Sequence, residues 1–172
     1  MLVGTAFSAP IHDAAMYGNL AGVQAELDKG VDVNAKNDFG ETPLDMVLWL
    51  NGASETADLI RKRGGKTSKE LIALSDAVRT GNIEDVKKHL AAGADVNIKD
   101  DNWGATPLHF AARNGRKGKA ELLIAEGADV NAQRGDGETP LDDAILFKQT
   151  KIADLLRKHG GKTGEELEAA VK

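Results

Sequence analysis

Apolar residues along the chain recur at the spacing of short helices, and glycines and polar residues separate the apolar segments. Val86 and Leu90 lie four residues apart, and Leu108, Ala111 and Ala112 follow the same helical spacing, so each set falls on one face of a helix. The small alanines would let a neighbouring helix approach closely. The pattern predicts pairs of short α-helices joined by turns.

The first helix of each pair is expected to begin at a Thr-Pro dipeptide. Thr42, Thr106 and Thr139 each precede a proline. A threonine at the N-cap accepts a hydrogen bond from a free amide, and proline at the first helical position lacks only an N–H that the helix does not use. The second helices are expected to end at glycines, which suit a left-handed C-cap. These glycines are Gly30, Gly64, Gly93, Gly127 and Gly160.

These signals repeat with a fixed period. Pro10 and Pro43 are 33 residues apart, and so are Pro107 and Pro140. The phrase Asp-Val-Asn occurs three times, each time shortly after a helix-ending glycine and eight or nine residues before a Thr-Pro-Leu segment. A period of this length is typical of stacked supersecondary units, each of which relies on its neighbours to bury its apolar face.

The joint pattern resembles the ankyrin repeat, in the form of a bacterial-type array. The resemblance implies an all-α solenoid of about five helix-turn-helix repeats, with short β-hairpin fingers formed around the Asp-Val-Asn phrase. It covers nearly the whole chain, which we therefore interpret as a single domain over residues 1–172. The expected repeats are about 5–37, 38–69, 70–100, 101–133 and 134–172.

Two repeats depart from the pattern. The second and fifth lack Asp-Val-Asn and end in Gly-Gly-Lys-Thr. The threonine of this segment, Thr67 or Thr163, is also the first residue of a Thr-x-x-Glu capping box. A helix should therefore start directly at both places. We expect the first helix of the third repeat to be lengthened at its N-terminus by residues 69–74, without a finger at 64–72. Smaller insertions are expected near residues 51–53 and in the finger that holds Trp103.

Composition restricts the classes of partner. The chain has 172 residues, 22 Lys plus Arg against 27 Asp plus Glu, and a net charge of −5, so the basic surface typical of nucleic-acid binding is missing. No window approaches the roughly 20 apolar residues that a membrane span needs. The absence of cysteine excludes disulfides and thiol chemistry. Residues 1–9 faintly resemble the end of a secretory signal, so an exported protein stays open beside the favoured cytoplasmic one.

Three motifs have the residue types of chemical sites. The Gly-Gly-Lys-Thr segments look like the end of a phosphate-binding loop, but Ile60 and Leu156 occupy the positions of the required earlier glycine. The Asp-x-Asn phrases lack the third ligand and the glycine of a calcium loop. The four histidines show no metal-ligand spacing. We expect no catalytic residue, no metal and no cofactor.

The histidines of the Thr-Pro-Leu-His segments have a structural interpretation. In the family that the chain resembles, this side chain forms hydrogen bonds between adjacent repeats, which implies that role for His12 and His109. Asp45 and Asp142 stand in the same slot of the second and fifth repeats. We expect these two carboxylates to accept hydrogen bonds from the nearby threonine or from backbone amides.

The resemblance also implies where a partner would bind. Ankyrin proteins use a concave face made of finger tips and first-helix ends, and five of the seven aromatic residues fall at matching positions. Aromatic side chains are common anchors of binding sites; the alternative is that several of them pack between repeats. The predicted partner-binding residues are Tyr17, Phe39, Trp49, Arg79, Asn102, Trp103, Arg113, Asn114 and Phe147.

The sequence therefore favours a non-catalytic protein–protein interaction module that acts as a monomer on an unidentified protein partner. Two alternatives stay open. A small-molecule or nucleotide-handling enzyme would need a deep pocket with converging titratable groups. A purely structural spacer would keep all of its interactions when Trp103 and Phe39 are replaced by alanine.

Overall fold

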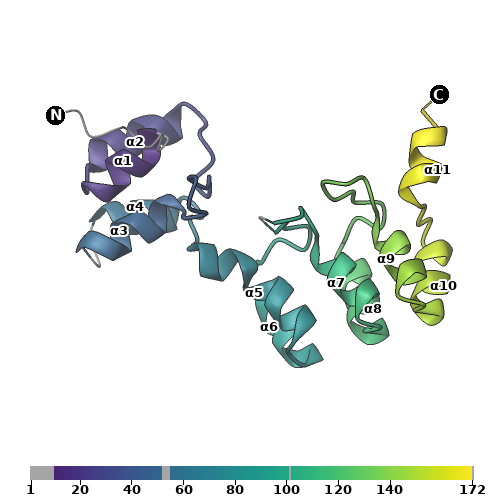
Figure 1. Ribbon diagram of the computed structural model, residues 1–172. Helices are drawn as coiled ribbons and strands as arrows, with labels where there is room; N and C mark the ends of the chain where they lie inside the picture. Colours follow the sequence, from purple (N-terminus) through teal and green to yellow (C-terminus); the bar gives the residue numbers. More distant parts are fainter. Residues whose placement is uncertain (1–9, 52–54, 101, 172) are drawn as a thin grey trace. The chain divides into compact units, whose positions relative to one another are not determined.

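The computed structural model describes residues 10–51, 55–100 and 102–171, and every regular element in these ranges is an α-helix (Figure 1). The helices follow one another in pairs, which confirms the expected all-α repeat fold. The chain divides into two compact units, residues 1–70 and 71–172, and each is described by itself. The signal-like segment 1–9 and the insertion expected around residue 53 lie outside the described residues.

The first unit contains two helix pairs. Helices α1 (Pro10–Met16) and α2 (Leu20–Asp28) form one pair, and α3 (Pro43–Asn51) and α4 (Glu55–Lys62) form the other. Helix α1 packs against α3, and α2 packs against α4. Their shared core consists of buried aliphatic side chains from all four helices: Ala15, Val23, Leu44, Met46, Val47, Ala57 and Ile60.

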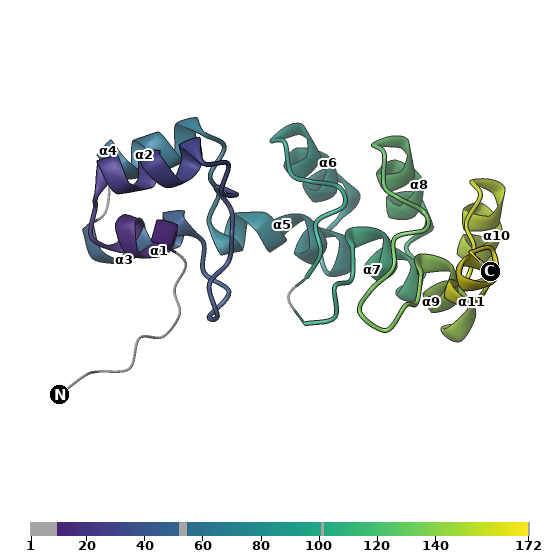
Figure 2. The same ribbon diagram turned by 90° about the horizontal axis from the view of Figure 1, so that it is seen from above.

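The second unit contains three helix pairs and a final short helix. The pairs are α5 (Ser68–Arg79) with α6 (Ile83–Ala91), α7 (Pro107–Arg113) with α8 (Lys117–Ala125), and α9 (Pro140–Leu146) with α10 (Thr150–Lys158), followed by α11 (Gly164–Ala169). The first three residues of α5 precede the boundary between the units. Helices α7 and α9 lie in one row, and α6, α8 and α10 lie in another (Figure 2).

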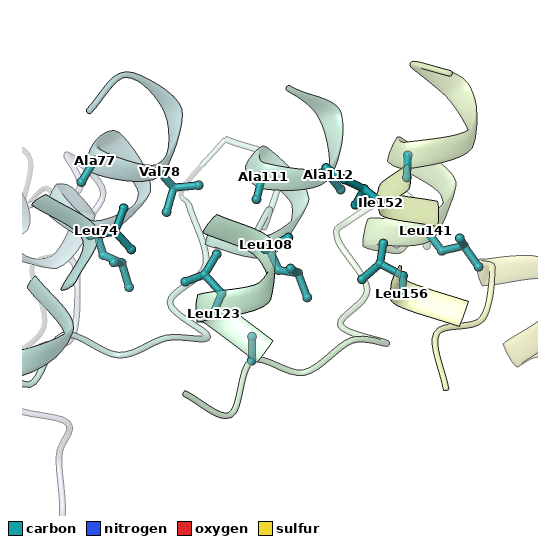
Figure 3. Packing of buried hydrophobic residues seen from close by; sticks show 14 residues of the cluster. Leu74, Ala77, Val78, Leu108, Ala111, Ala112, Leu123, Leu141, Ile152 and Leu156 are labelled. Atoms are coloured by element: carbon teal, nitrogen blue, oxygen red, sulfur yellow. The ribbon is translucent and has the colours of Figure 1, made fainter. Parts of the chain in front are cut away.

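The core of the second unit runs continuously from pair to pair (Figure 3). Leu74, Leu108, Leu123, Leu141 and Leu156 come from five different helices, and all are fully buried. Burying one leucine side chain contributes roughly 1.5–3 kcal/mol. Because each helix pair supplies only part of the cover for these side chains, the pairs stabilise one another, as the repeat pattern predicts.

The fingers before α3, α7 and α9 are tight, hairpin-shaped turns. Each is closed by a backbone hydrogen bond: Asn37 N–H to Glu41 O at 3.0 Å, Asp100 N–H to Ala105 O at 2.9 Å, and Arg134 N–H to Glu138 O at 3.0 Å. No described residue of these fingers belongs to a β-strand. The arms between the closing bond and the turn are too short for a ladder, so the fingers have the predicted shape without paired strands.

Helix α5 begins directly after the preceding helix pair, as expected. Its capping box is formed, because the Thr67 amide donates to Glu70 Oε2 at 2.7 Å and the Glu70 amide donates to Thr67 Oγ1 at 3.1 Å. Helix α5 has 12 residues, whereas α7 and α9 have 7 each. The described residues 64–72 form the end of one helix pair and the start of α5, and they contain no finger.

The Gly-Gly-Lys-Thr segments are helix caps. Gly64, with a φ of +87°, donates its amide to Arg61 O at 3.0 Å, and Gly65 donates to Ile60 O at 2.8 Å. These two hydrogen bonds close the end of α4. A Cβ on Gly65 would lie 2.2 Å from Ile60 Cγ2, so glycine is required there by packing. The structure therefore explains both glycines without a phosphate ligand.

The Asp-Val-Asn phrases connect successive repeats within each unit. The asparagine donates its side-chain amide to the carbonyl of the next helix-ending glycine, as Asn97 does to Gly127 at 3.2 Å and Asn131 does to Gly160 at 3.2 Å. Its side-chain oxygen accepts a backbone amide from Asp129 or Lys162 at 2.8 Å. The asparagines of the pattern that resembles a calcium loop thus form hydrogen bonds between repeats.

Candidate functional site

The second unit has a pocket between two fingers and two first helices. Its volume is about 320 Å³, and it is lined by residues of helices α7 and α9 and of the fingers that hold Trp103 and Asp136. The lining residues are Trp103, Ala105, His109, Phe110, Arg113, Arg134, Asp136 and Asp143. The pocket therefore combines two aromatic rings with a group of charged side chains.

A buried carboxylate holds the charged side of the pocket together. The side chain of Asp143 is 1% exposed, and its Oδ1 lies 3.2 Å from Arg113 Nη2 and 3.3 Å from Arg134 Nη1. Burial raises the pKa of Asp143, and the two guanidinium groups oppose that rise. A single carboxylate oxygen is thus shared by two cations.

Arg134 uses its remaining donors to fix its own finger. Its Nε donates to Asp136 Oδ1 at 2.9 Å, and it also pairs with Glu138. Its side chain is only 9% exposed. Every nitrogen of the guanidinium is hydrogen-bonded to one of three acidic residues. Arg134 therefore links its finger to α9.

Arg113 is bound less completely. Its guanidinium lies 4.9 Å from the centroid of the Phe147 ring, which fixes its plane. Its Nε is buried and has no hydrogen-bond partner among the described residues. Its side chain is 39% exposed. The buried Nε is closed to a ligand, but the exposed part of the side chain lets a ligand in the pocket approach the positive charge of Arg113.

The aromatic side of the pocket is formed by Trp103 and Phe110. Trp103 is 69% exposed, although its backbone is fixed: its amide donates to Asp100 Oδ1 at 3.0 Å, and its carbonyl accepts the Gly135 amide at 2.8 Å. The second bond ties the two neighbouring fingers together. Phe110 lies under the guanidinium of Arg79, 5.7 Å from its ring centroid.

A second, more open hollow of about 550 Å³ lies between the same two fingers. Trp103, Arg134 and Asp136 line both hollows. Asn102 lines the second one, and Lys99 crosses it by donating to Gln133 O at 2.9 Å. The exposed indole of Trp103 thus borders two adjoining depressions on one surface.

The residues predicted for this unit lie around the pocket in different ways. Trp103 and Arg113 line it, Asn102 borders the adjoining hollow, and Arg79 and Phe147 stack on its neighbours. Asn114 is engaged in the fold, because its side-chain amide donates to Phe110 O at 2.8 Å at the end of α7.

The predicted residues of the first unit are strongly exposed. Tyr17, Phe39 and Trp49 each show about three quarters of their surface to solvent, namely 75%, 78% and 77%. None of them is packed into the core between helix pairs. Their side chains stand at the ends of α1 and α3 and on the finger before α3.

Sequence reasoning missed Arg134, Phe110 and Asp143 as pocket residues. A signal was present for Asp143, which occupies the helical position that Phe110 has in the preceding repeat. Two arginines, Arg113 and Arg134, lie in the neighbouring first helix and finger. A carboxylate in a core-facing slot needs such cations, but the local pattern does not say which ones reach it.

His109 serves the fold and is neutral at pH 7. Its Nδ1 accepts the Thr106 amide at 3.1 Å, and its Nε2 donates to Glu138 O in the next finger at 3.2 Å. Burial lowers its pKa to about 4. The hydrogen bond between adjacent repeats that was expected for His109 is present, as is that of His12 to Ala35 O and Glu41 O.

Both aspartates that replace these histidines accept the expected bonds. Asp45 Oδ2 accepts from the Thr42 amide and hydroxyl, and Asp142 Oδ2 does the same with Thr139. Among the described residues, no cluster of three metal-ligating side chains occurs. None of the helices described is both long and apolar enough to cross a membrane.

The paired helices, the fingers and the hydrogen bonds between neighbouring pairs define a helical repeat protein. Two family descriptions match: "Ankyrin repeats (3 copies)" over residues 74–166 and "Ankyrin repeats (many copies)" over residues 11–59. The chain belongs to the ankyrin repeat family. Repeats of this family are generally protein–protein interaction modules.

Curated relatives match through only a small part of their length. The ARF GTPase-activating protein GIT1 of Homo sapiens is 42% identical over 97 residues, which are 56% of this chain and 13% of the relative. The ARF GTPase-activating protein Git of Drosophila melanogaster is 42% identical over 83 residues, or 48% and 11%. The neurogenic locus Notch protein of the same species is 34% identical over 128 residues, or 74% and 4%.

These relatives are eukaryotic, so they do not support the bacterial type that the repeat pattern suggested. Their names describe whole proteins of which this chain resembles a short part. The resemblance concerns the ankyrin repeats.

Proposed function

We propose that the chain is a non-catalytic binding module that holds a partner protein against the pocket around Trp103 and Arg113. The observation that carries this proposal is that the exposed indole of Trp103 and the partly exposed guanidinium of Arg113 line the same pocket. Tryptophan and arginine are the residue types most often found at the energetic centre of protein interfaces. Family membership supports the same class of function.

The pocket is preorganised for binding. The backbone of Trp103 is held by hydrogen bonds at both its amide and its carbonyl, and Arg113 is held by Asp143 and Phe147. Docking to a backbone and a guanidinium that are already held in place costs less conformational entropy than docking to mobile groups. The exposed Tyr17, Phe39 and Trp49 provide further contact positions on the first unit in this proposal.

An enzymatic function is less well supported by the pocket chemistry. Its titratable groups point at one another: Asp143 lies between two arginines, and both ring nitrogens of His109 are hydrogen-bonded inside the fold. A general base needs a free lone pair within reach of the substrate. We therefore keep the expectation that the chain acts by binding.

Affinity capture with the full chain tests this function. Wild-type chain would be compared with a triple variant carrying Phe39→Ala, Trp103→Ala and Arg113→Ala, using lysate of the source cells. A control triple removes two exposed apolar groups and one cation from second helices, by Leu20→Ala, Ile83→Ala and Lys87→Ala. We expect the first variant to lose partners that the control retains. Equal recovery by all three chains would contradict the proposal and favour a spacer.

A further inference from the structure

Two arginine-on-phenylalanine stacks occur one repeat apart in the second unit. Arg79 lies over Phe110, and Arg113 lies over Phe147. Both arginines stand at the end of a first helix and two residues before a glycine, so they occupy the same register in neighbouring repeats. Stacking on a ring orients a guanidinium and leaves its edge free for hydrogen bonds.

Both cations have charge to offer a ligand. Arg113 shares one carboxylate oxygen with Arg134, and its side chain is 39% exposed. Arg79 pairs with Asp76 at 2.7 Å, three residues earlier on its own helix. Both members of that pair are about half exposed, and such surface pairs are weak. An incoming carboxylate can therefore bind either guanidinium.

An apolar surface adjoins the two cations. Phe110 lies beneath Arg79 and also lines the pocket beside Arg113, with the exposed Trp103 opposite. The pocket of about 320 Å³ is large enough for one side chain. A ligand that bridges the two arginines would therefore place an apolar group over Phe110 and Trp103.

The repeat geometry sets the spacing of the ligand groups. Packed helices lie about 8–10 Å apart, and an extended chain advances about 3.3 Å per residue. Because Arg79 reaches the Phe110 ring of α7, this estimate places the groups that bind Arg79 and Arg113 about three residues apart. This spacing fits an extended peptide better than two adjacent charges.

We propose that this face binds an extended acidic segment of a partner protein, with two carboxylates about three residues apart and an apolar or aromatic side chain between them. The carboxylates bind Arg79 and Arg113, and the apolar side chain enters the pocket. This inference rests on the proposed protein-binding function and specifies the chemistry of the partner.

Charge complementarity favours a peptide over a longer polyanion. Asp76 pairs with Arg79, Asp136 and Glu138 pair with Arg134 beside the pocket, and the whole chain carries a net charge of −5. A nucleic acid or an anionic membrane would bring a continuous row of negative charges against these acids. A short segment with two separated carboxylates avoids them.

Selection from a displayed library of random twelve-residue peptides tests the proposal with the full chain as bait. We expect selected peptides to be enriched in Asp or Glu at two positions three apart, with an apolar residue between. A synthetic, fluorescein-labelled peptide of the selected sequence would then be titrated by fluorescence anisotropy. Replacing its two acids by Asn or Gln should weaken binding at least about tenfold.

Protein variants locate the binding site. Arg113→Ala should weaken binding of the acidic peptide about tenfold, and Arg79→Ala, which leaves the buried Asp143 pairs intact, about threefold. The control Lys87→Ala removes one exposed cation from α6 and should leave the dissociation constant unchanged. Circular dichroism would show that each variant is folded. If Arg113→Ala does not fold, Arg79→Ala still decides the test.

The outcomes separate this inference from the function on which it rests. Selected peptides without acidic enrichment, whose binding still falls in Trp103→Ala, would overturn the acidic segment and leave the proposed function standing. Peptides that bind wild type and both arginine variants equally would also overturn it. Failure to select any peptide that depends on Trp103 would contradict both. Stronger binding to single-stranded RNA or to phosphatidylserine vesicles than to the acidic peptide would overturn the inference.

Discussion

Lys119 is a buried cation at a position where the next repeat has an apolar residue. It occupies a core-facing slot of α8, where the next repeat has the buried Ile152. Its ammonium donates to Ala77 O at 3.1 Å, to Val78 O at 2.7 Å and to Gly81 O at 2.7 Å. These carbonyls lie at the end of α5, where a cation also complements the helix dipole. Burial lowers the pKa of Lys119.

Replacing Lys119 by methionine should destabilise the chain. The substitution keeps the length of the side chain but removes the Lys119 donor from Val78 O and Gly81 O, while Ala77 O keeps the Gly81 amide. We therefore expect unfolding to require about 1–3 kcal/mol less free energy. Urea denaturation followed by circular dichroism measures the change. Lys117→Met, on the exposed side of the same helix, is the control. If Lys119→Met is as stable as the wild type or more stable, the cost of burying the ammonium exceeds the gain from its hydrogen bonds.

His109 predicts a pH dependence of stability. Its pKa is about 4 in the folded chain against 6.5 unfolded, so the unfolded chain binds a proton that the folded chain does not. The contribution of the neutral His109 to the free energy of unfolding is fully present above pH 6.5. It falls by about 3 kcal/mol as the pH is lowered toward 4. Arg134 and Lys99, which face the ring, disfavour protonation, while Asp136 favours it.

Comparison with His109→Gln isolates this contribution, because carboxylates titrate in part of the same range. Urea unfolding of both chains between pH 4 and 7.5 should show a difference in stability that narrows as the pH falls. A difference independent of pH would show that His109 is not a neutral, buried group.

At the scale of elements, the residue in the Thr-Pro-Leu-x slot matches the junction to the next repeat. Where that junction is a finger, His12 and His109 donate to finger carbonyls. Where a helix begins directly, Asp45 and Asp142 accept the amide of its first residue, Ser68 or Gly164, at 2.8 Å. The histidine thus donates to the carbonyls of a finger, and the aspartate accepts the first amide of a helix. The type of junction therefore matches the choice between histidine and aspartate.

Asp142→Ala should loosen the junction between α9 and α11. The carboxylate accepts from the Thr139 amide, from its hydroxyl and from the Gly164 amide, and we expect a loss of about 2 kcal/mol. Differential scanning calorimetry gives the stability, and hydrogen exchange at Gly164 gives the local effect. Asp154→Ala on the exposed side of α10 should change neither. Unchanged protection of Gly164 would contradict the assignment.

Helix boundaries and junctions could be predicted because their signals are local. The capping box at Thr67 and the missing Asp-Val-Asn were enough to predict a longer α5 without a finger. The pocket network could not be predicted in the same way. Arg134 reaches Asp143 from a finger, and Lys119 reaches back across α5, so both depend on how far a long side chain extends in three dimensions. Periodicity carries no information on that reach.

At the scale of the whole molecule, the sequence predicts one array over residues 1–172. In such an array, stability depends on interfaces between neighbours, and distant repeats unfold together when those interfaces are strong. Native-state hydrogen exchange measured by mass spectrometry tests this expectation. Amides in α3 and in α9 should exchange with the same opening free energy under conditions where global unfolding dominates. Separate values would show two independently unfolding units.

The main proposal is that the face around Trp103 and Arg113 holds a partner protein. Amide and indole chemical-shift mapping of the labelled full chain, titrated with the selected acidic peptide, tests it at the binding surface itself. We predict that the largest shifts fall on the Trp103 indole, on the fingers at 98–105 and 131–139, and on the ends of α5 and α7. Shifts confined to α6, α8 and α10 would contradict it.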